Sequence, residues 1–279
     1  MDKRRMCPHC RAFITTSDRV CPYCHETVGP RAAEQRDTGA VLAGFIPQAR
    51  FTTIVILVIN FGLYLATTLF SLRQGNTDAM WNIDIRTLFD FGARNREAIL
   101  LGKQWWRLVT AGFLHGGLMH ILMNSWVLFD LGAEVEAAYG TSRMLVFYFI
   151  STVCGFLAST MFSSAVISVG ASAGLFGLIG AMIAFGMRHQ SALGAAIRGL
   201  YVRWAIYGLL FGLLPFFRVD NAAHIGGLAS GFAVAYVAGL PRVSSSLREQ
   251  FWRGMAAACI VLTVLSFLQM YLWFAHSGS

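Results

Sequence analysis

Four polar residues lie within otherwise apolar stretches of the chain, and their types are those that acyl-transfer chemistry uses. Ser172 stands in the small-residue run 170–174, and His224 stands near the start of a later apolar run. His120 and Asn124 are four residues apart, so they share one face of a helix. A serine activated by a histidine, with hydrogen-bond donors facing the developing oxyanion, is sufficient for hydrolysing a peptide bond.

Each of these residues also has a purely structural interpretation. A serine between glycines in an apolar helix usually serves packing, and the G-x-S-x-G elbow of soluble hydrolases needs a strand before the helix. A histidine in such a helix can be a core residue or a proton relay, and His120 with Asn124 can join two helices. The chemical interpretation therefore depends on whether helices bring Ser172, His224 and His120 to one depth.

The composition indicates that these residues lie in a membrane. Hydrophobic residues make up 56% of the 279-residue chain and charged residues 13%, against roughly 25% charged residues in soluble domains. This excludes a disordered chain and a soluble enzyme, and it leaves too little polar surface for nucleic acid despite a net charge of +8. Seven apolar runs are candidate spans. They cover residues 52–72, 113–131, 144–162, 172–187, 204–217, 223–240 and 255–274.

Alternation of the spans places the starts of the second, fourth and sixth on one side of the membrane. Arginines such as Arg143, Arg188 and Arg248 fall in the loops of the opposite side, which predicts a cytosolic N-terminus and an outer C-terminus. With no signal peptide before about residue 52, this favours a bacterial-type plasma (inner) membrane. The polar residues of the three spans then lie a few turns below the outer surface.

This placement assigns roles to the four residues. Ser172 is the predicted nucleophile and His224 the general base, while His120 and Asn124 face the oxyanion. Asp220 precedes His224 by one helical turn, but no triad acid is evident, so a Ser-His dyad is the simpler prediction.

Two glycines follow the histidine at helical spacing. Gly227 and Gly231 are three and seven residues after His224, so all three share one face of the predicted sixth span. Small residues four apart let another helix backbone approach closely. The sixth span is therefore expected to pack tightly on a neighbour through this stripe.

The N-terminus contains a separate metal-binding pattern of two C-x2-C knuckles. Its four cysteines are Cys7, Cys10, Cys21 and Cys24. Two knuckles on short turns form a tetrahedral zinc site, and so small a module would not fold without its metal. Two disulfides, or a redox C-x2-C, are the alternatives; the first needs an oxidising compartment and the second a surrounding α/β fold. We expect structural zinc.

The ordered motifs over about residues 50–275 resemble the signature of the rhomboid intramembrane serine proteases. The matching residues are Trp106-Arg107, His115, His120, Asn124, Gly170-Ala171-Ser172 and Ala223-His224-Ile225-Gly226-Gly227. The resemblance implies the same dyad and oxyanion residues, Gly227 and Gly231 packing the sixth span on the fourth, and an aromatic ring, Phe176, against the histidine. It also implies transmembrane protein substrates within the lipid bilayer and no cofactor for catalysis.

The chain departs from that family at one conserved link. Ala138 stands where many members have an arginine two residues after the glutamate, here Glu136. The structural Glu-Arg link of the family is therefore not expected in this protein, although the chemistry does not depend on it.

The predicted fold class is an all-α polytopic membrane protein with a six-helix rhomboid-like core and one extra C-terminal helix. The predicted divisions are a zinc-ribbon-like module at 1–28, a linker at 29–50, the core at 51–241, and a loop with the seventh helix at 242–279. The zinc module is a candidate for binding a cytosolic partner.

The predicted function is intramembrane proteolysis, and three alternatives differ from it in class. A catalytically silent rhomboid-like binding or escort protein typically lacks the serine or the histidine, both of which are present. An intramembrane metalloprotease needs H-E-x-x-H, whereas His115 and His120 are five apart and do not share a face. A transporter would show paired half-helices or an inverted repeat, and neither is evident.

Overall fold

The computed structural model describes residues 4–7, 9–15, 18–28, 51–214, 219–239 and 247–277. The chain divides into two compact units, Met1–Gln48 and Ala49–Ser279. The linker expected at 29–50 lies outside the described residues.

The described residues of the smaller unit include a two-stranded antiparallel hairpin that packs against two of the cysteines. Strand β1 (Arg4–Met6) pairs with β2 (Phe13–Thr15), and Met6 lies opposite Phe13. Among these described residues, the buried side chains are Cys7, Ile14, Cys21 and Val28. Two of the four are cysteines, so packing among the described residues contributes little apolar stabilisation.

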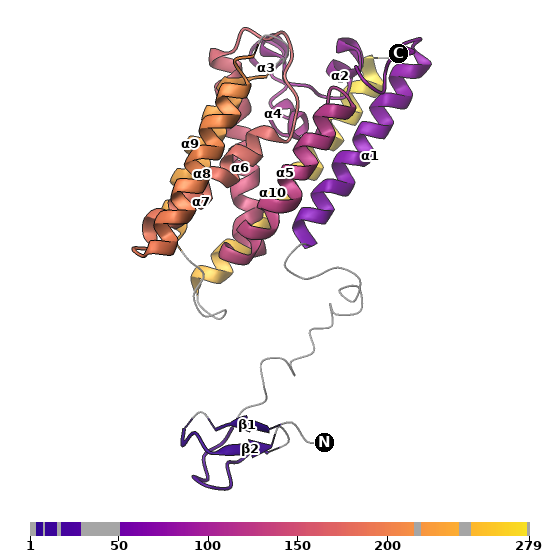
Figure 1. Cartoon of the computed structure of the whole chain (residues 1–279). Coiled ribbons are helices and arrows are strands. Elements are labelled where there is room, and N and C mark those ends of the chain that lie inside the picture. Colours follow the sequence, from indigo (N-terminus) through magenta and orange to yellow (C-terminus); the bar gives the residue numbers. More distant parts are fainter. Residues whose placement is uncertain are drawn as a thin grey trace. The chain divides into compact units, whose positions relative to one another are not determined.

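The larger unit is helical, and its long helices match the seven predicted spans in number and order (Figure 1). Their bounds are α1 Phe51–Arg73, α5 Leu118–Tyr139, α6 Thr141–Phe162, α7 Ser172–Arg188, α8 Ala192–Phe211, α9 Asn221–Ala238 and α10 Leu247–Ser277. Helices α1 and α6, and Leu247–His276 of α10, are long and apolar enough to cross a membrane, and α7 is apolar but shorter. The predicted all-α fold class is confirmed.

Helix α10 begins at Leu247 and not at 255, and two other helix starts also differ clearly from the apolar runs that predicted them. Helix α5 begins at Leu118 and not at 113, because Gly117 lies against the backbone of Trp81, where a Cβ atom would overlap the carbonyl oxygen. Helix α8 begins at Ala192, capped by the side chain of Ser191, which accepts a hydrogen bond from Gly194 N (3.1 Å). Arginines on an exposed face do not end a helix, so hydropathy alone placed this start too late.

Short helices fill the connection between α1 and α5. They are α2 Ile85–Asp90, α3 Arg96–Leu100, α4 Arg107–Thr110 and the 3₁₀ turn η4 Ala111–Phe113. The Arg107 side chain is fully buried and donates to the carbonyls of Phe89 (2.6 Å) and Ala93 (3.0 Å). A buried guanidinium needs such acceptors, so Arg107 fixes the path of this connection.

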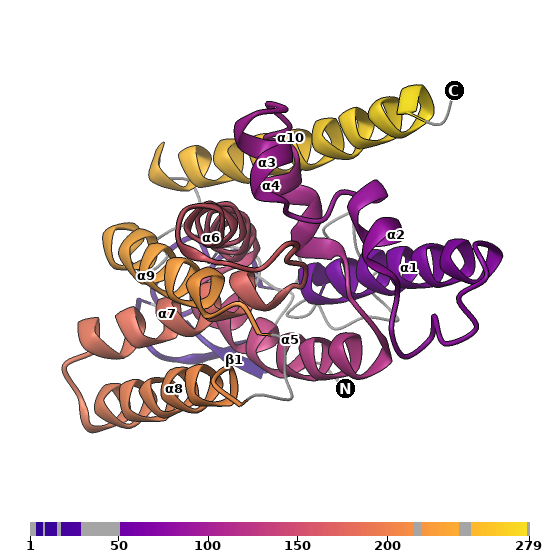
Figure 2. The same cartoon turned by 90° about the horizontal axis from the view of Figure 1, so that it is seen from above.

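Helix α7 forms the centre of the bundle. It packs against α5, α6, α8 and α9, which surround it in the view of Figure 2. Most of its residues are buried, whereas α8 buries only Gly194, Tyr201 and Ala205. The helix that begins with Ser172 is thus the most enclosed of the long helices.

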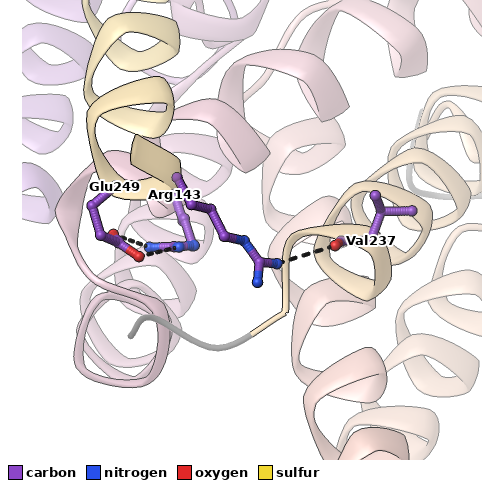
Figure 3. A network of polar contacts seen from close by, with 4 residues as sticks. Arg143, Val237 and Glu249 are labelled. Atoms are coloured by element: carbon purple, nitrogen blue, oxygen red, sulfur yellow. Dashed lines mark hydrogen bonds and ion pairs between the residues drawn. The ribbon is translucent and has the colours of Figure 1, made fainter. Parts of the chain in front are cut away.

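An ion pair fixes the start of α10. Arg143 at the start of α6 makes two hydrogen bonds to the Glu249 carboxylate, of 2.6 and 2.7 Å (Figure 3). The side chains of Arg143 and Glu249 are 2% and 12% exposed, and the guanidinium carbon lies 5.4 Å from the ring of Trp252. Arg248 adds a 3.4 Å bond to the Val237 carbonyl of α9.

Glu136, which has no arginine two residues after it, is held by hydrogen bonds from neutral side chains. The Glu136 carboxylate accepts hydrogen bonds from Thr52 Oγ1 (2.7 Å) and Thr141 Oγ1 (2.8 Å). Glu136 therefore ties the start of α1 to the turn between α5 and α6 with neutral donors.

We expect Glu249→Gln to destabilise the protein by about 3 kcal/mol, because breaking a buried ion pair leaves an uncompensated charge. Thermal unfolding in detergent measures the effect. The double variant Arg143→Met/Glu249→Met should regain part of the loss, and Arg253→Gln, at an exposed position one turn further along α10, should match wild type. A Glu249→Gln protein that unfolds at the wild-type temperature would show that the pair does not hold α10.

Candidate active site

Ser172 is the first residue of α7, and the backbone before it requires glycine. Gly170 has φ +132, and its N–H donates to the Ala111 carbonyl (2.9 Å). A Cβ atom at Gly170 would lie 2.7 Å from Nε2 of His120 and 3.6 Å from Oγ of Ser172. The glycine therefore lets the chain pass directly beside His120 as it enters α7.

His224 contacts Ser172 from a different helix. Its Nε2 lies 2.8 Å from Ser172 Oγ, which is a hydrogen bond. The ring is 6% exposed and stacks on Phe176, with centroids 4.1 Å apart and planes at 14°. Phe176 is one turn after Ser172, so α7 supplies both the hydroxyl and the surface that orients the imidazole.

Asp220 does not bond to the histidine ring. It caps α9, accepting from Ala223 N (3.2 Å), and its other carboxylate oxygen accepts from Ser159 Oγ. Within the described residues, Nδ1 of His224 has no hydrogen-bond partner. The geometry is that of a serine–histidine pair without a third acidic residue.

His120 and Asn124 lie on the α5 side of the same region. His120 Nδ1 accepts from Gly116 N (3.3 Å), which leaves Nε2 on the side of Gly170 and Ser172. Asn124 Nδ2 donates to the His120 carbonyl (2.9 Å), so one of its two N–H groups is engaged within α5. The ring of His115 lies edge-on to that of His120, with centroids 5.1 Å apart.

The glycine stripe sets the distance between α7 and α9. A Cβ atom on Gly227 would overlap the Ala173 carbonyl oxygen, and one on Gly231 would overlap that of Gly177. Only glycine fits at such an approach. The stripe therefore brings His224 within hydrogen-bond distance of Ser172.

The four cysteines of the smaller unit form a potential metal site. Their sulfur atoms all lie within 4.8 Å of one another, and all four thiols are free. Four sulfur donors at this spacing fit a tetrahedral metal ion.

The fold and this geometry define a polytopic helical membrane protein with a serine and a histidine in contact between two of its helices. The family model described as Rhomboid domain matches residues 102–241. This is half of the chain, and the chain belongs to the rhomboid family.

Similar proteins include one named as a protease and one named as inactive. Rhomboid protease GluP of Bacillus subtilis is 31% identical over 236 residues, covering 84% of this chain and 43% of GluP. The mitochondrial RHOMBOID-like protein 6 of Arabidopsis thaliana is 37% identical over 155 residues (54% and 49%). Inactive RHOMBOID-like protein 8 of the same plant is 32% identical over 163 residues (58% and 46%). The chain spans about half the length of these relatives.

We expect Gly227→Ala to destabilise the protein by about 1–3 kcal/mol, because the added methyl group must push α9 away from α7. Thermal unfolding of the purified protein tests this. Gly62→Ala is the matched control, since nothing lies within 4 Å of a Cβ atom at that helix position. Equal unfolding temperatures for the two variants would contradict the tight α7–α9 contact.

Proposed function

We propose that this chain is an intramembrane serine protease that hydrolyses peptide bonds in or near transmembrane segments of membrane proteins. The observation that supports the proposal most directly is the 2.8 Å hydrogen bond between His224 Nε2 and Ser172 Oγ. Nucleophile and base must lie within this distance for the proton to transfer.

The proposed reaction has two steps. As Ser172 Oγ attacks the substrate carbonyl, its proton moves to His224 Nε2, which then donates it to the leaving amine. Water next attacks the acyl-enzyme and gives a proton to His224, which returns it to Ser172 Oγ as the acyl–oxygen bond breaks and the carboxylic acid product leaves. Stacking on Phe176 holds the ring in place for both proton transfers.

Three groups are candidates for stabilising the oxyanion. The backbone N–H of Ser172 is unpaired within α7, because the first turn of a helix leaves its N–H groups free, and the positive end of the helix dipole lies there. His120 Nε2 faces the same region. Asn124 offers the second N–H of its amide, since the first bonds to the His120 carbonyl.

The principal alternative is a catalytically silent rhomboid-like protein that binds or escorts membrane proteins. One relative is named inactive, so family membership alone does not decide between them. The hydrogen-bonded serine and histidine of this chain favour the enzyme. In either case we infer a location in the plasma membrane. The arginines of the loops support the orientation that we propose, with a cytosolic N-terminus and an outer C-terminus.

A fluorophosphonate probe tests the enzyme proposal without knowledge of the substrate. We expect wild type to be labelled at Ser172, and Ser172→Ala and His224→Ala to reduce the labelling rate by roughly 1000-fold or more, because an unactivated serine is a weak nucleophile.

Ser230→Ala is the control for that experiment. Ser230 lies on α9 and bonds only to backbone carbonyls of its own helix, at 2.7 and 3.1 Å, so this variant should be labelled at the wild-type rate. Folded wild type that resists the probe, beside an active rhomboid as positive control, would favour the silent binding protein.

We further propose that the four cysteines hold structural zinc. We expect elemental analysis of the purified chain to find about one zinc ion per molecule, and Cys21→Ser to lose most of it, since Cys21 is fully buried in the cluster. Cys154→Ser changes a cysteine of α6 outside the cluster and should retain the metal. Full zinc content in Cys21→Ser would contradict this site.

Binding of a cytosolic partner by this unit is a further proposal, since exposed Phe13 and Tyr23 offer it apolar surface.

A further inference from the structure

A fully buried arginine lies beside the proposed active site. Arg94 stands between α2 and α3, and its side chain is 0% exposed. Within the described residues no carboxylate forms an ion pair with it. Burying a guanidinium is costly unless its N–H groups find acceptors, so the position of those acceptors shows what Arg94 holds together.

The side chain of Arg94 bonds to the end of α6 and to the connection that follows. Nη1 donates to the Ala165 carbonyl (2.8 Å), Nη2 to the Ser159 carbonyl, and Nε approaches Thr160 Oγ1 at 3.4 Å. Three N–H groups of one planar fork thus fix three points of a single segment.

The backbone of Arg94 bonds to the same segment closer to the serine. Arg94 N donates to Ser168 O, and Ser168 N donates to Arg94 O, both at 3.0 Å. Ser168 is four residues before Ser172. The adjacent Asn95 side chain donates to the Val166 carbonyl (3.0 Å). The approach to α7 is therefore held from 159 to 168 by Arg94 and its neighbour.

The same segment is connected to the helix that carries the histidine. Ser159 Oγ donates to the Asp220 carboxylate. Asp220 caps α9 through Ala223 N, and its carbonyl accepts from His224 N (3.1 Å). Asp220 also attracts the Arg94 charge and so opposes the lowering of the Arg94 pKa by burial.

We propose that Arg94 is a positioning residue that sets Ser172 relative to His224. It does so by holding the connection before α7 and, through Ser159 and Asp220, the first turn of α9. The inference rests on the proposed function, because its consequence is the reactivity of the serine. In this proposal, Arg94 influences the geometry of Ser172 and His224 through the segments that it binds.

The test compares Arg94→Met with Arg96→Met. Arg96 lies two residues away, and its exposed side chain makes only a weak 3.4 Å contact with the Met161 carbonyl among the described residues, so it controls for loss of a positive charge. Because misplacing reacting groups by about 1 Å costs on the order of 100-fold in rate, we expect Arg94→Met to lower fluorophosphonate labelling of Ser172 roughly 10- to 100-fold. Arg96→Met should stay within about twofold of wild type, and Arg94→Lys, which can reach fewer acceptors, should be intermediate.

Ser159→Ala separates positioning from folding. It removes the hydroxyl that binds Asp220 but keeps the carbonyl that accepts from Arg94. We expect it to lower the labelling rate several-fold with little change in unfolding temperature. In the double variant with Arg94→Met, the two losses should combine to less than their product, because both residues act through one network.

The outcomes distinguish this inference from the proposed function. Wild type labelled at Ser172, with Arg94→Met and Ser159→Ala labelled at the wild-type rate, overturns the positioning role alone. If the labelling rate of the double variant falls by the full product of the two single losses, the two residues act independently, and the link through Ser159 is overturned. Wild type that is folded but never labelled overturns the proposed function and, with it, this inference.

Discussion

The close contact between α7 and α9 is the constraint on which the rest of the structure depends. Helices surrounded by lipid gain little from burying apolar side chains, so they are held by close packing and by hydrogen bonds. Gly227 and Gly231 bring the backbone of α9 against carbonyl oxygens of α7. Ser172 and His224 are 52 residues apart in the chain. Their hydrogen bond depends on the close approach of α7 and α9, which the two glycines permit.

Three buried arginines fix the connections and ends of the helices through their hydrogen bonds. Arg94, Arg107 and Arg143 are among the largest fully buried side chains of the protein. Two of them bind backbone carbonyls around α2 to α4 and the approach to α7, and the third binds Glu249 of α10. An arginine in an apolar setting must keep its acceptors, so each makes displacement of its loop or helix end costly.

The sequence predicted those features of the fold and the site that follow from local residue patterns. Apolar runs predicted the long helices, and alternation across the membrane predicted that Ser172 and His224 lie on one side. The spacing of the cysteines predicted a cluster that the structure contains. Helix starts were predicted less accurately. Helix α5 begins later than predicted because Gly117 interrupts an apolar run, and α8 begins earlier because its N-terminal part contains arginines. Arg94 gave no signal, since a single arginine in a polar loop is ordinary until its acceptors are known.

Burial is distributed unevenly around the proposed site, and this bears on how a substrate reaches it. Helix α10 is held at one end by Glu249 and at the other by Trp273, whose ring lies 4.9 Å from the Arg107 guanidinium. Displacing it would break a buried ion pair and uncover a buried arginine. Helix α8 buries few residues, and the contact of Tyr201 with Glu134 of α5 is a single hydrogen bond. Of the helices that pack against α7, α8 therefore buries the fewest of its own residues, so displacing it would uncover the fewest buried side chains.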